Sequence, residues 1–200
     1  MLERCSRLLV ATSNRGKIEE FRRLLPEFEL LSLGDCHGVK LPPEGEKSFA
    51  ENALAKARVA WQATGLPSVA DDSGLEVDAL GGAPGVISAR YAGEGCTDRD
   101  NIDLLLRNLR GVPEERRTAR FVCVVALVFH GCERVFTGTC DGHIALSPRG
   151  MNGFGYDPVF IPQGSSRTFG EMESWEKDKY SHRMKAIVRL RDALLGGEIP

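Results

Sequence analysis

Two long apolar segments separated by a very short turn constrain the fold of this chain more than any other feature. Residues 119–130, ARFVCVVALVFH, and residues 133–145, ERVFTGTCDGHIA, both have the composition of β-strands. Only Gly131 and Cys132 separate them, which suffices for a hairpin but not for a crossover between parallel strands. The two strands are therefore expected to form a hairpin, and the sheet that contains them cannot be wholly parallel.

Shorter strands alternate with helices over the rest of the chain. Apolar runs typical of buried strands span residues 7–12, 28–33 and 66–72. Segments with apolar residues at helical spacing span residues 16–25, 48–65, 97–109 and about 181–195. A Gly-rich loop that enters a further strand is expected within residues 153–161. This order predicts an α/β fold with a mixed central sheet flanked by helices.

Capping signals support three of these helices. Asn14 is the predicted N-cap of the first helix. Ser48 and Glu51 match a capping box at the start of the second helix, and Thr97 and Asp100 match another at the start of the third.

The composition is that of an ordinary globular protein of 200 residues, with 42% hydrophobic and 27% charged residues. This length fits one domain, or two closely joined lobes, so we expect a single domain over residues 1–200. The formal net charge of −2 excludes a broad basic surface, and nucleic acid is not an expected partner.

No membrane or export segment is expected. The longest apolar run, residues 121–129, is too short to cross a bilayer, and the first 14 residues lack a signal-peptide core. The six cysteines are scattered, without a CxxC pair or a histidine at zinc spacing. These features predict a cytoplasmic protein with reduced thiols and no structural zinc.

Two segments near helix starts are candidate phosphate sites. Residues 11–17, ATSNRGK, join a strand to a helix, where backbone N–H groups and Lys17 would attract an anion. The segment is not a Walker P-loop, because the first glycine of that motif is missing, and helix capping explains it as well. Glu44 precedes the next helix, on which Asn52 and Lys56 share a face that is either solvated or a phosphate clamp.

Asp71 and Asp72 stand side by side in VADDSG, where an apolar run meets a glycine. Neighbouring carboxylates repel and aspartate is a poor strand former, so the pair needs a compensating interaction. In a strand the two side chains point to opposite faces. A turn with Asx hydrogen bonds is one interpretation. We favour the other, in which the strand ends at a ligand site, one aspartate binds a metal and the other holds a loop.

Aromatic and basic residues near the C-terminus suggest a nucleotide-base site. Phe154 or Tyr156 could stack on a base, and Lys177, His182 and Arg183 could contact a base or a phosphate. The alternatives are that the aromatic rings pack in the core, that His182 caps the last helix and that the lysines are solvated.

Five segments occur together in the order and spacing of one known family: VATSNRGK, SFAENALAKA, ADDSGLEVDALGGAPGVISARYAG, GFGYDPVF and SHR. Over about residues 8–195 the chain therefore resembles the inosine/xanthosine triphosphate pyrophosphatases. The resemblance implies an elongated α/β homodimer whose subunits have two lobes, with the nucleotide in a cleft between them. It also implies magnesium-dependent hydrolysis of ITP, dITP and XTP to the monophosphate and pyrophosphate.

The resemblance also implies roles for individual residues. Asp72 would be the general base and, with Glu44, would bind Mg²⁺; Glu46 is the alternative to Glu44. The residues that would contact the substrate are Thr12, Ser13, Asn14, Arg15, Gly16, Lys17, Lys56, Ser73, Phe154, Gly155, Tyr156, Asp157, Lys177, His182 and Arg183. Asp71 is a further candidate in the same site.

Hydrogen bonding to the purine C6 oxygen would select the base. Inosine and xanthosine present an acceptor at C6 where adenosine presents a donor, and one buried mismatch costs roughly 1–3 kcal/mol. Backbone N–H groups of residues 154–157 and the side chains of His182 and Arg183 are the candidate donors. Two other function classes stay open: a pyrophosphatase for modified pyrimidine triphosphates, and a nucleotide-binding protein without catalysis.

Overall fold

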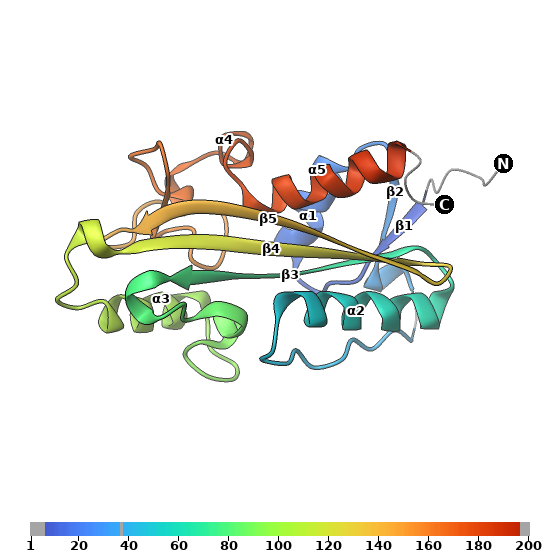
Figure 1. The fold of residues 1–200 in the computed structure, drawn as a ribbon, viewed down its shortest axis with the longest axis horizontal. Coiled ribbons are helices and arrows are strands. Elements are labelled where there is room, and N and C mark those ends of the chain that lie inside the picture. The colour runs from blue at the N-terminus through green and yellow to red at the C-terminus, as the bar shows by residue number, and fades with distance from the viewer. Residues whose placement is uncertain (1–6, 37, 197–200) are drawn as a thin grey trace. The chain divides into compact units, whose positions relative to one another are not determined.

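The computed structural model describes residues 7–36 and 38–196. Over these residues one sheet has the strand order β2-β1-β3-β4-β5-β6 (Figure 1). Its strands are β1 (Arg7–Val10), β2 (Glu29–Ser32), β3 (Ser68–Val77), β4 (Thr118–Phe129), β5 (Cys132–Ile144) and β6 (Phe160–Pro162). The α-helices are α1 (Arg15–Leu24), α2 (Phe49–Thr64), α3 (Asp98–Asn108), α4 (Ser174–Asp178) and α5 (His182–Leu195).

The sheet is mixed, as the sequence predicted. β1 runs parallel to β2 and to β3, whereas β5 and β6 are antiparallel. β4 and β5 are neighbours joined by His130 and Gly131, one residue earlier than the predicted turn. Both residues have positive φ, 44° and 77°, which is the backbone that a tight two-residue hairpin loop requires.

The chain divides into two compact units. Unit 1 comprises residues up to Asp72, together with Cys123–Gly138 and the chain from Arg183 onward; unit 2 comprises Ser73–Val122 and Thr139–His182. The boundaries fall within β3, β4 and β5 and at the start of α5.

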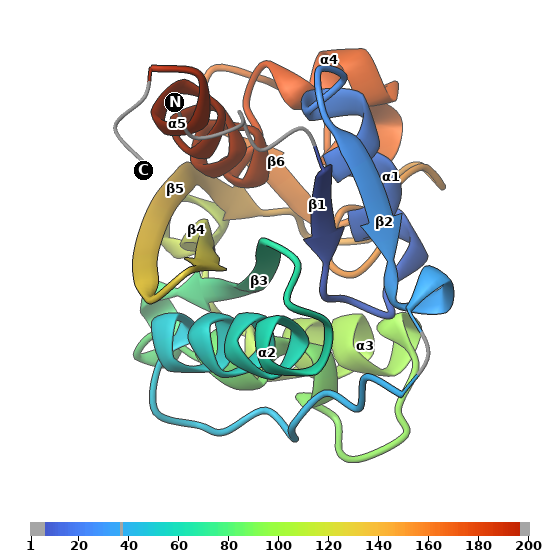
Figure 2. The same cartoon turned by 90° about the vertical axis from the view of Figure 1, so that its right-hand side faces the viewer.

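The core of unit 1 lies between its part of the sheet and two helices. Phe21 and Leu25, at the end of α1, and Ile187 of α5 pack against buried residues of β1, β3 and β4. In Figures 1 and 2, α2 lies on the opposite face of these strands from α5. The buried side of α2 includes alanines 53, 57 and 60, whose helical spacing and small size let the helix lie close to the strands.

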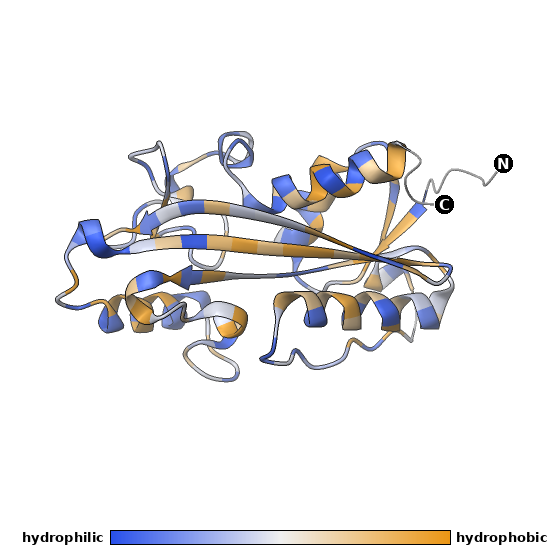
Figure 3. Cartoon of the chain, viewed as in Figure 1, coloured by the Kyte–Doolittle hydropathy of each residue, from blue (hydrophilic) through white to orange (hydrophobic). Residues whose placement is uncertain are grey.

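Aromatic residues dominate the core of unit 2. The rings of Phe121 and Phe160 lie 4.6 Å apart, and those of Phe160 and Phe169 lie 5.2 Å apart. Leu105 of α3 and Leu75 of β3 complete the same cluster. Figure 3 shows β4, which runs through both cores, as a predominantly apolar strand.

The predicted helix starts are confirmed. The side chain of Asn14 accepts a hydrogen bond from Lys17 N, and that of Ser48 accepts one from Glu51 N. Thr97 and Asp100 form a reciprocal capping box at α3. These signals depend on residues three positions apart, so the local sequence suffices to predict them.

One sequence prediction is wrong, and one short helix was not predicted. β3 does not end at Asp72 but continues to Val77, with Leu75 and Val77 buried. The Gly-rich segment forms turns until Phe160, where β6 begins, so the predicted loop that enters a strand is confirmed, with a strand of only three residues. The short helix α4 carries no periodic apolar signal and was not predicted.

No helix within the described ranges is long and apolar enough to cross a membrane.

Candidate active site

Asp71 and Asp72 lie within β3 and contact different helices. The Oδ2 atom of Asp71 lies 3.1 Å from Nζ of Lys17 in α1 and 3.1 Å from Nε of Arg183 in α5. Asp72 instead accepts a hydrogen bond of 2.8 Å from Asn52 of α2. Neighbouring residues of a strand point to opposite faces, so the predicted separation of the two side chains is confirmed.

Asp71 belongs to a buried ion cluster in unit 1. Arg183, which is 2% exposed, contacts both Asp71 and Glu20 of α1. Burial alone would lower the pKa of Arg183, but the carboxylates of Glu20 and Asp71 outweigh burial and raise this pKa above its usual value. Asp71 therefore joins two helices to β3, and the interpretation that one aspartate of the pair holds a loop stays a prediction.

Asp72 belongs to a second cluster, which we call the Glu44–Asp72 cluster: Glu44, Asn52, Lys56 and Asp72. Nζ of Lys56 lies 2.7 Å from Oε1 of Glu44 and 3.7 Å from Oδ1 of Asp72. Burial alone would lower the pKa of Lys56, but Asp71, Asp72 and Glu44 outweigh burial and raise it, so this ammonium group stays charged.

The environment of Asp72 suits a general base. Burial raises the pKa of Asp72, while Lys56 and Asn52 oppose the shift and Glu44 adds to it. The net pKa is above the usual value for aspartate. A carboxylate with a raised pKa takes up a proton more readily, which favours acid–base chemistry at this position.

The Glu44–Asp72 cluster also fits a magnesium ion. Two carboxylates converge on one ammonium group, so this position already holds positive charge. Among residues 7–36 and 38–196 no group of three or more Asp, Glu, His or Cys could hold a metal alone. Magnesium in phosphate-binding sites commonly uses only one or two carboxylates together with phosphate oxygens. The contact with Lys56 favours Glu44 over the exposed Glu46 as the partner of Asp72.

The predicted phosphate segment lies at the N-terminus of α1 in the same unit. Oγ1 of Thr12 accepts a hydrogen bond from Asn14 N at 3.2 Å, and Oδ1 of Asn14 accepts one from Lys17 N at 3.1 Å. Ser13, Asn14 and Arg15 are exposed. These side chains order the turn and leave its outer surface open to an anion.

In unit 2, Phe154, Asp157 and Lys177 form one group. Nζ of Lys177 lies 2.7 Å from Oδ2 of the buried Asp157 and 4.9 Å from the centre of the Phe154 ring. His182 stacks on Phe121 at 4.7 Å with an interplanar angle of 9°. The structure thus places the aromatic ring of Phe154 beside the cation Lys177.

The structure corrects part of the predicted base site. The N–H of Phe154 donates to Asp157, and the N–H of Gly155 donates to Asp98, so these two backbone donors are engaged within the protein. The ring of Tyr156 lies in the core and its hydroxyl donates to the carbonyl oxygen of Ser88. Phe154 is therefore the aromatic side chain of this loop that fits stacking on a base.

Gly153 has a specific steric role in this loop. Its φ is +77°, and a Cβ atom there would lie 1.9 Å from Oδ2 of Asp157. Gly155 has a similar φ of +60°, but a Cβ there would meet nothing within 4 Å. We expect Gly153→Ala to lower the free energy of unfolding by about 1–3 kcal/mol more than Gly155→Ala, because only the first displaces Asp157. Urea denaturation of both variants measures the difference, and equal losses would contradict it.

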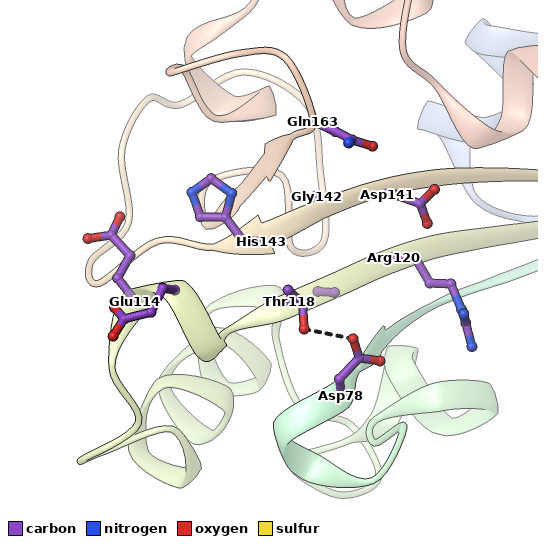
Figure 4. Close-up of a pocket in the computed structure, with 10 residues that line it drawn as sticks. Asp78, Glu114, Thr118, Arg120, Asp141, Gly142, His143 and Gln163 are labelled. Atoms are coloured by element: carbon purple, nitrogen blue, oxygen red, sulfur yellow. Dashed lines mark hydrogen bonds between the residues drawn. The ribbon is translucent and has the colours of Figure 1, made fainter.

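A hollow of about 770 Å³ lies elsewhere in unit 2 and contains none of the predicted site residues. Figure 4 shows Thr118 pointing to Asp78, whose carboxylate accepts its hydrogen bond at 2.7 Å. Four carboxylates line the hollow, against Arg120 and His143. This mainly acidic lining disfavours a triphosphate.

One residue of the clusters, Glu20, was not predicted as functional, and the contacts of a second, Asn52, were not predicted. Glu20 was one charge among several on an expected amphipathic helix, and its partner Arg183 is 163 residues away. Asn52 was predicted, with Lys56, to lie on a helix face that is either solvated or a phosphate clamp. Its hydrogen bonds to Gly45 and Asp72 were not predicted.

The comparisons with known proteins decide the family. The Ham1 family model matches residues 8–193. The chain belongs to the Ham1 family. A dITP/XTP pyrophosphatase of Mycobacterium tuberculosis is 52% identical over 194 residues, covering 94% of this chain and 95% of that protein. A dITP/XTP pyrophosphatase of Geobacillus kaustophilus is 47% identical and covers 96% of this chain and 97% of its own length.

Solved structures of the family share the fold. A HAM1 protein from Coxiella burnetii aligns with a TM-score of 0.86 at 39% identity, covering 95% of this chain and 98% of that one. The Ham1 protein of Staphylococcus aureus aligns with a TM-score of 0.85 at 38% identity, covering 96% of this chain and 100% of that one. These matches confirm the predicted α/β fold and the family resemblance.

Proposed function

We propose that this chain hydrolyses the non-standard purine nucleoside triphosphates ITP, dITP and XTP to the monophosphate and pyrophosphate. Such an activity removes these nucleotides before they are incorporated into DNA or RNA. The observation that carries the proposal is the Glu44–Asp72 cluster, in which a buried carboxylate of raised pKa lies beside a second carboxylate and a lysine. Family membership and the names of the relatives support the same reaction.

In the proposed reaction, water attacks the α-phosphorus. A new P–O bond forms, the bond to the bridging oxygen breaks, and pyrophosphate leaves with the electron pair. Asp72 orients this water and takes up its proton. When bound by Glu44 and Asp72, magnesium supplies positive charge beside the phosphate oxygens.

Two lysines of unit 1 bind the triphosphate in this proposal. Lys56 exchanges its contacts with Glu44 and Asp72 for phosphate oxygens, and Lys17 lies in the first turn of α1. Preorganised positive charge of this kind stabilises the negative charge that develops on the leaving group. Ser73, which follows Asp72 in β3, is also proposed to contact the substrate.

Unit 2 supplies the residues proposed to recognise the base. Phe154 stacks on the purine, and Lys177, which lies beside its ring while paired with Asp157, and His182 are the proposed donors to the C6 oxygen. Arg183 is held by Glu20 and Asp71, so its contribution is to position these carboxylates rather than to bind the base. Donors arranged to bind the C6 oxygen would stay unpaired when ATP binds, because adenine has an amine donor at C6. Such a site therefore binds ATP less well.

Product analysis tests the proposal. With Mg²⁺ present, we expect ITP and XTP to yield monophosphate and pyrophosphate, resolved by ion chromatography, while ATP stays largely intact. Orthophosphate and a diphosphate would show attack at the γ-phosphorus and overturn the mechanism. Preferential cleavage of modified pyrimidine triphosphates would favour the pyrimidine alternative, and absence of any product would favour a binding protein.

We also propose that the chain acts as a cytoplasmic homodimer.

A further inference from the structure

Asn52 connects two parts of the Glu44–Asp72 cluster through a single amide group. Its Oδ1 atom accepts a hydrogen bond from Gly45 N at 2.8 Å. Its Nδ2 atom donates to the carbonyl oxygen of Gly45 at 3.1 Å and to Oδ2 of Asp72 at 2.8 Å. The side chain is buried, with 6% of the residue exposed, so these bonds form largely away from water.

The chemistry of this contact is specific to asparagine. A side-chain amide has one acceptor oxygen and two donor hydrogens. All three take part in the hydrogen bonds of Asn52 to Gly45 and Asp72. A carboxylate of the same shape would lack both donors, and an apolar side chain would leave the polar groups of Gly45 without this partner. The loop that carries Glu44 is therefore tied to α2 at the residue that follows Glu44.

The bond to Asp72 also orients that carboxylate. Because Asn52 holds Oδ2, the other oxygen, Oδ1, is the one that lies 3.7 Å from Nζ of Lys56. The same Nζ lies 2.7 Å from Glu44. Asn52 thus determines both where the Glu44 loop lies and which oxygen of Asp72 faces the position of positive charge.

We propose that Asn52 is a positioning residue that holds the Glu44 loop and the Asp72 carboxylate in the arrangement needed to bind a divalent cation. The proposal rests on the proposed function, because that function makes Glu44 and Asp72 the ligands of magnesium. Asn52 itself is not a ligand. Hydrogen bonds to metal ligands of this kind typically change metal affinity about 10- to 100-fold when they are removed.

Asn101 provides a matched control. It is also buried, and its amide also holds a loop through both ends: Oδ1 accepts from Ala92 N at 2.8 Å, and Nδ2 donates to the carbonyl oxygen of Ala89 at 3.2 Å. It lies in unit 2, and its side-chain hydrogen bonds to Ala89, Ala92 and Cys96 do not involve the Glu44–Asp72 cluster. Asn101→Ala therefore removes the same kind of loop contact without touching the proposed ligands.

Two measurements on the full chain test the proposal. Electron paramagnetic resonance titration, with a non-hydrolysable ITP analogue present, gives the affinity for Mn²⁺. Amide hydrogen exchange at Gly45 reports whether the Glu44 loop is still held. We expect Asn52→Ala to weaken Mn²⁺ binding about 10- to 100-fold and to speed exchange at Gly45. Asn101→Ala is expected to leave both unchanged. Asn52→Leu, which retains the side-chain volume, is expected to behave as Asn52→Ala.

The outcomes separate this inference from the function on which it rests. Unchanged Mn²⁺ affinity in both Asn52 variants, with a wild-type protein that binds Mn²⁺ and releases pyrophosphate from ITP, would overturn the positioning role alone. Normal affinity in Asn52→Leu with a loss only in Asn52→Ala would show that volume, not hydrogen bonding, is what the site requires. A wild-type protein that neither binds Mn²⁺ nor cleaves ITP would overturn the proposed function and the inference with it.

Discussion

Replacement of Asp72 by asparagine is expected to lower the turnover of ITP by at least ~10²-fold, a loss typical of a missing general base. Asparagine has nearly the same shape and can still accept the hydrogen bond from Asn52. It lacks the negative charge that would bind a cation and take up a proton. The folded state should persist, because the change removes a charge whose burial is unfavourable, as the raised pKa of Asp72 indicates.

Initial rates with ITP, measured at several Mg²⁺ concentrations, check this prediction. Asp78→Asn is the matched control, since Asp78 follows the same strand and accepts a hydrogen bond from Thr118 but lies outside both clusters. We expect that variant to retain normal turnover. Near-normal turnover of Asp72→Asn would remove Asp72 from the mechanism. Recovery of turnover at high Mg²⁺ would leave Asp72 a role as metal ligand and not as base.

The features of the fold that were predicted correctly depend on residues close together in the sequence. The short connection between β4 and β5 excluded a parallel crossover, and the resulting mixed sheet is observed. The caps at Asn14, Ser48 and Thr97 each involve a residue three positions away. Interactions over such spans can be read from the chain without knowing how it folds.

The end of β3 was predicted wrongly because its stabilising contacts are distant in sequence. Asp71 and Asp72 followed by Ser73 and Gly74 have the composition of a turn. In the structure these residues stay in the strand, and Asp71 receives a hydrogen bond from Arg183, 112 residues later. No local pattern indicates that such a cation will be present.

The candidate site was predictable only in part. Strand alternation correctly separated Asp71 from Asp72, and the family resemblance indicated Glu44 and Lys56, which the structure places together. The contacts of Asn52 and Glu20 could not be predicted, because they depend on how α1 and α2 pack against β3. The hydrogen bonds of the Phe154 and Gly155 N–H groups were likewise not predictable, because the first depends on the turns of the loop and the second on Asp98 of α3, 57 residues away.

The second large effect is expected at the buried ion cluster. Arg183→Met should lower the free energy of unfolding by about 3–5 kcal/mol, because Glu20 and Asp71 then lose a buried guanidinium partner while staying away from water. Lys17 still contacts Asp71 at 3.1 Å, so Glu20 is the carboxylate most affected. Methionine fills much of the arginine volume, which limits any loss from packing.

Urea denaturation of Arg183→Met and of Arg99→Met measures this effect against an exposed pair. Arg99 lies 3.1 Å from Asp103 on the surface of α3, with 74% of its side chain exposed. Exposed pairs of this kind contribute about 0.3–0.5 kcal/mol, so the control should change little. Similar small losses in both variants would mean that the carboxylates near Arg183 reach water when the arginine is removed.

A double variant separates the charge effect from packing. If the loss in Arg183→Met comes from leaving Glu20 buried without the guanidinium group, then adding Glu20→Leu removes that carboxylate and should restore part of the stability. If the loss comes from packing, the second substitution should add to the first. Partial recovery would therefore show that the arginine is required because it compensates the buried charge of Glu20, which α1 brings to it.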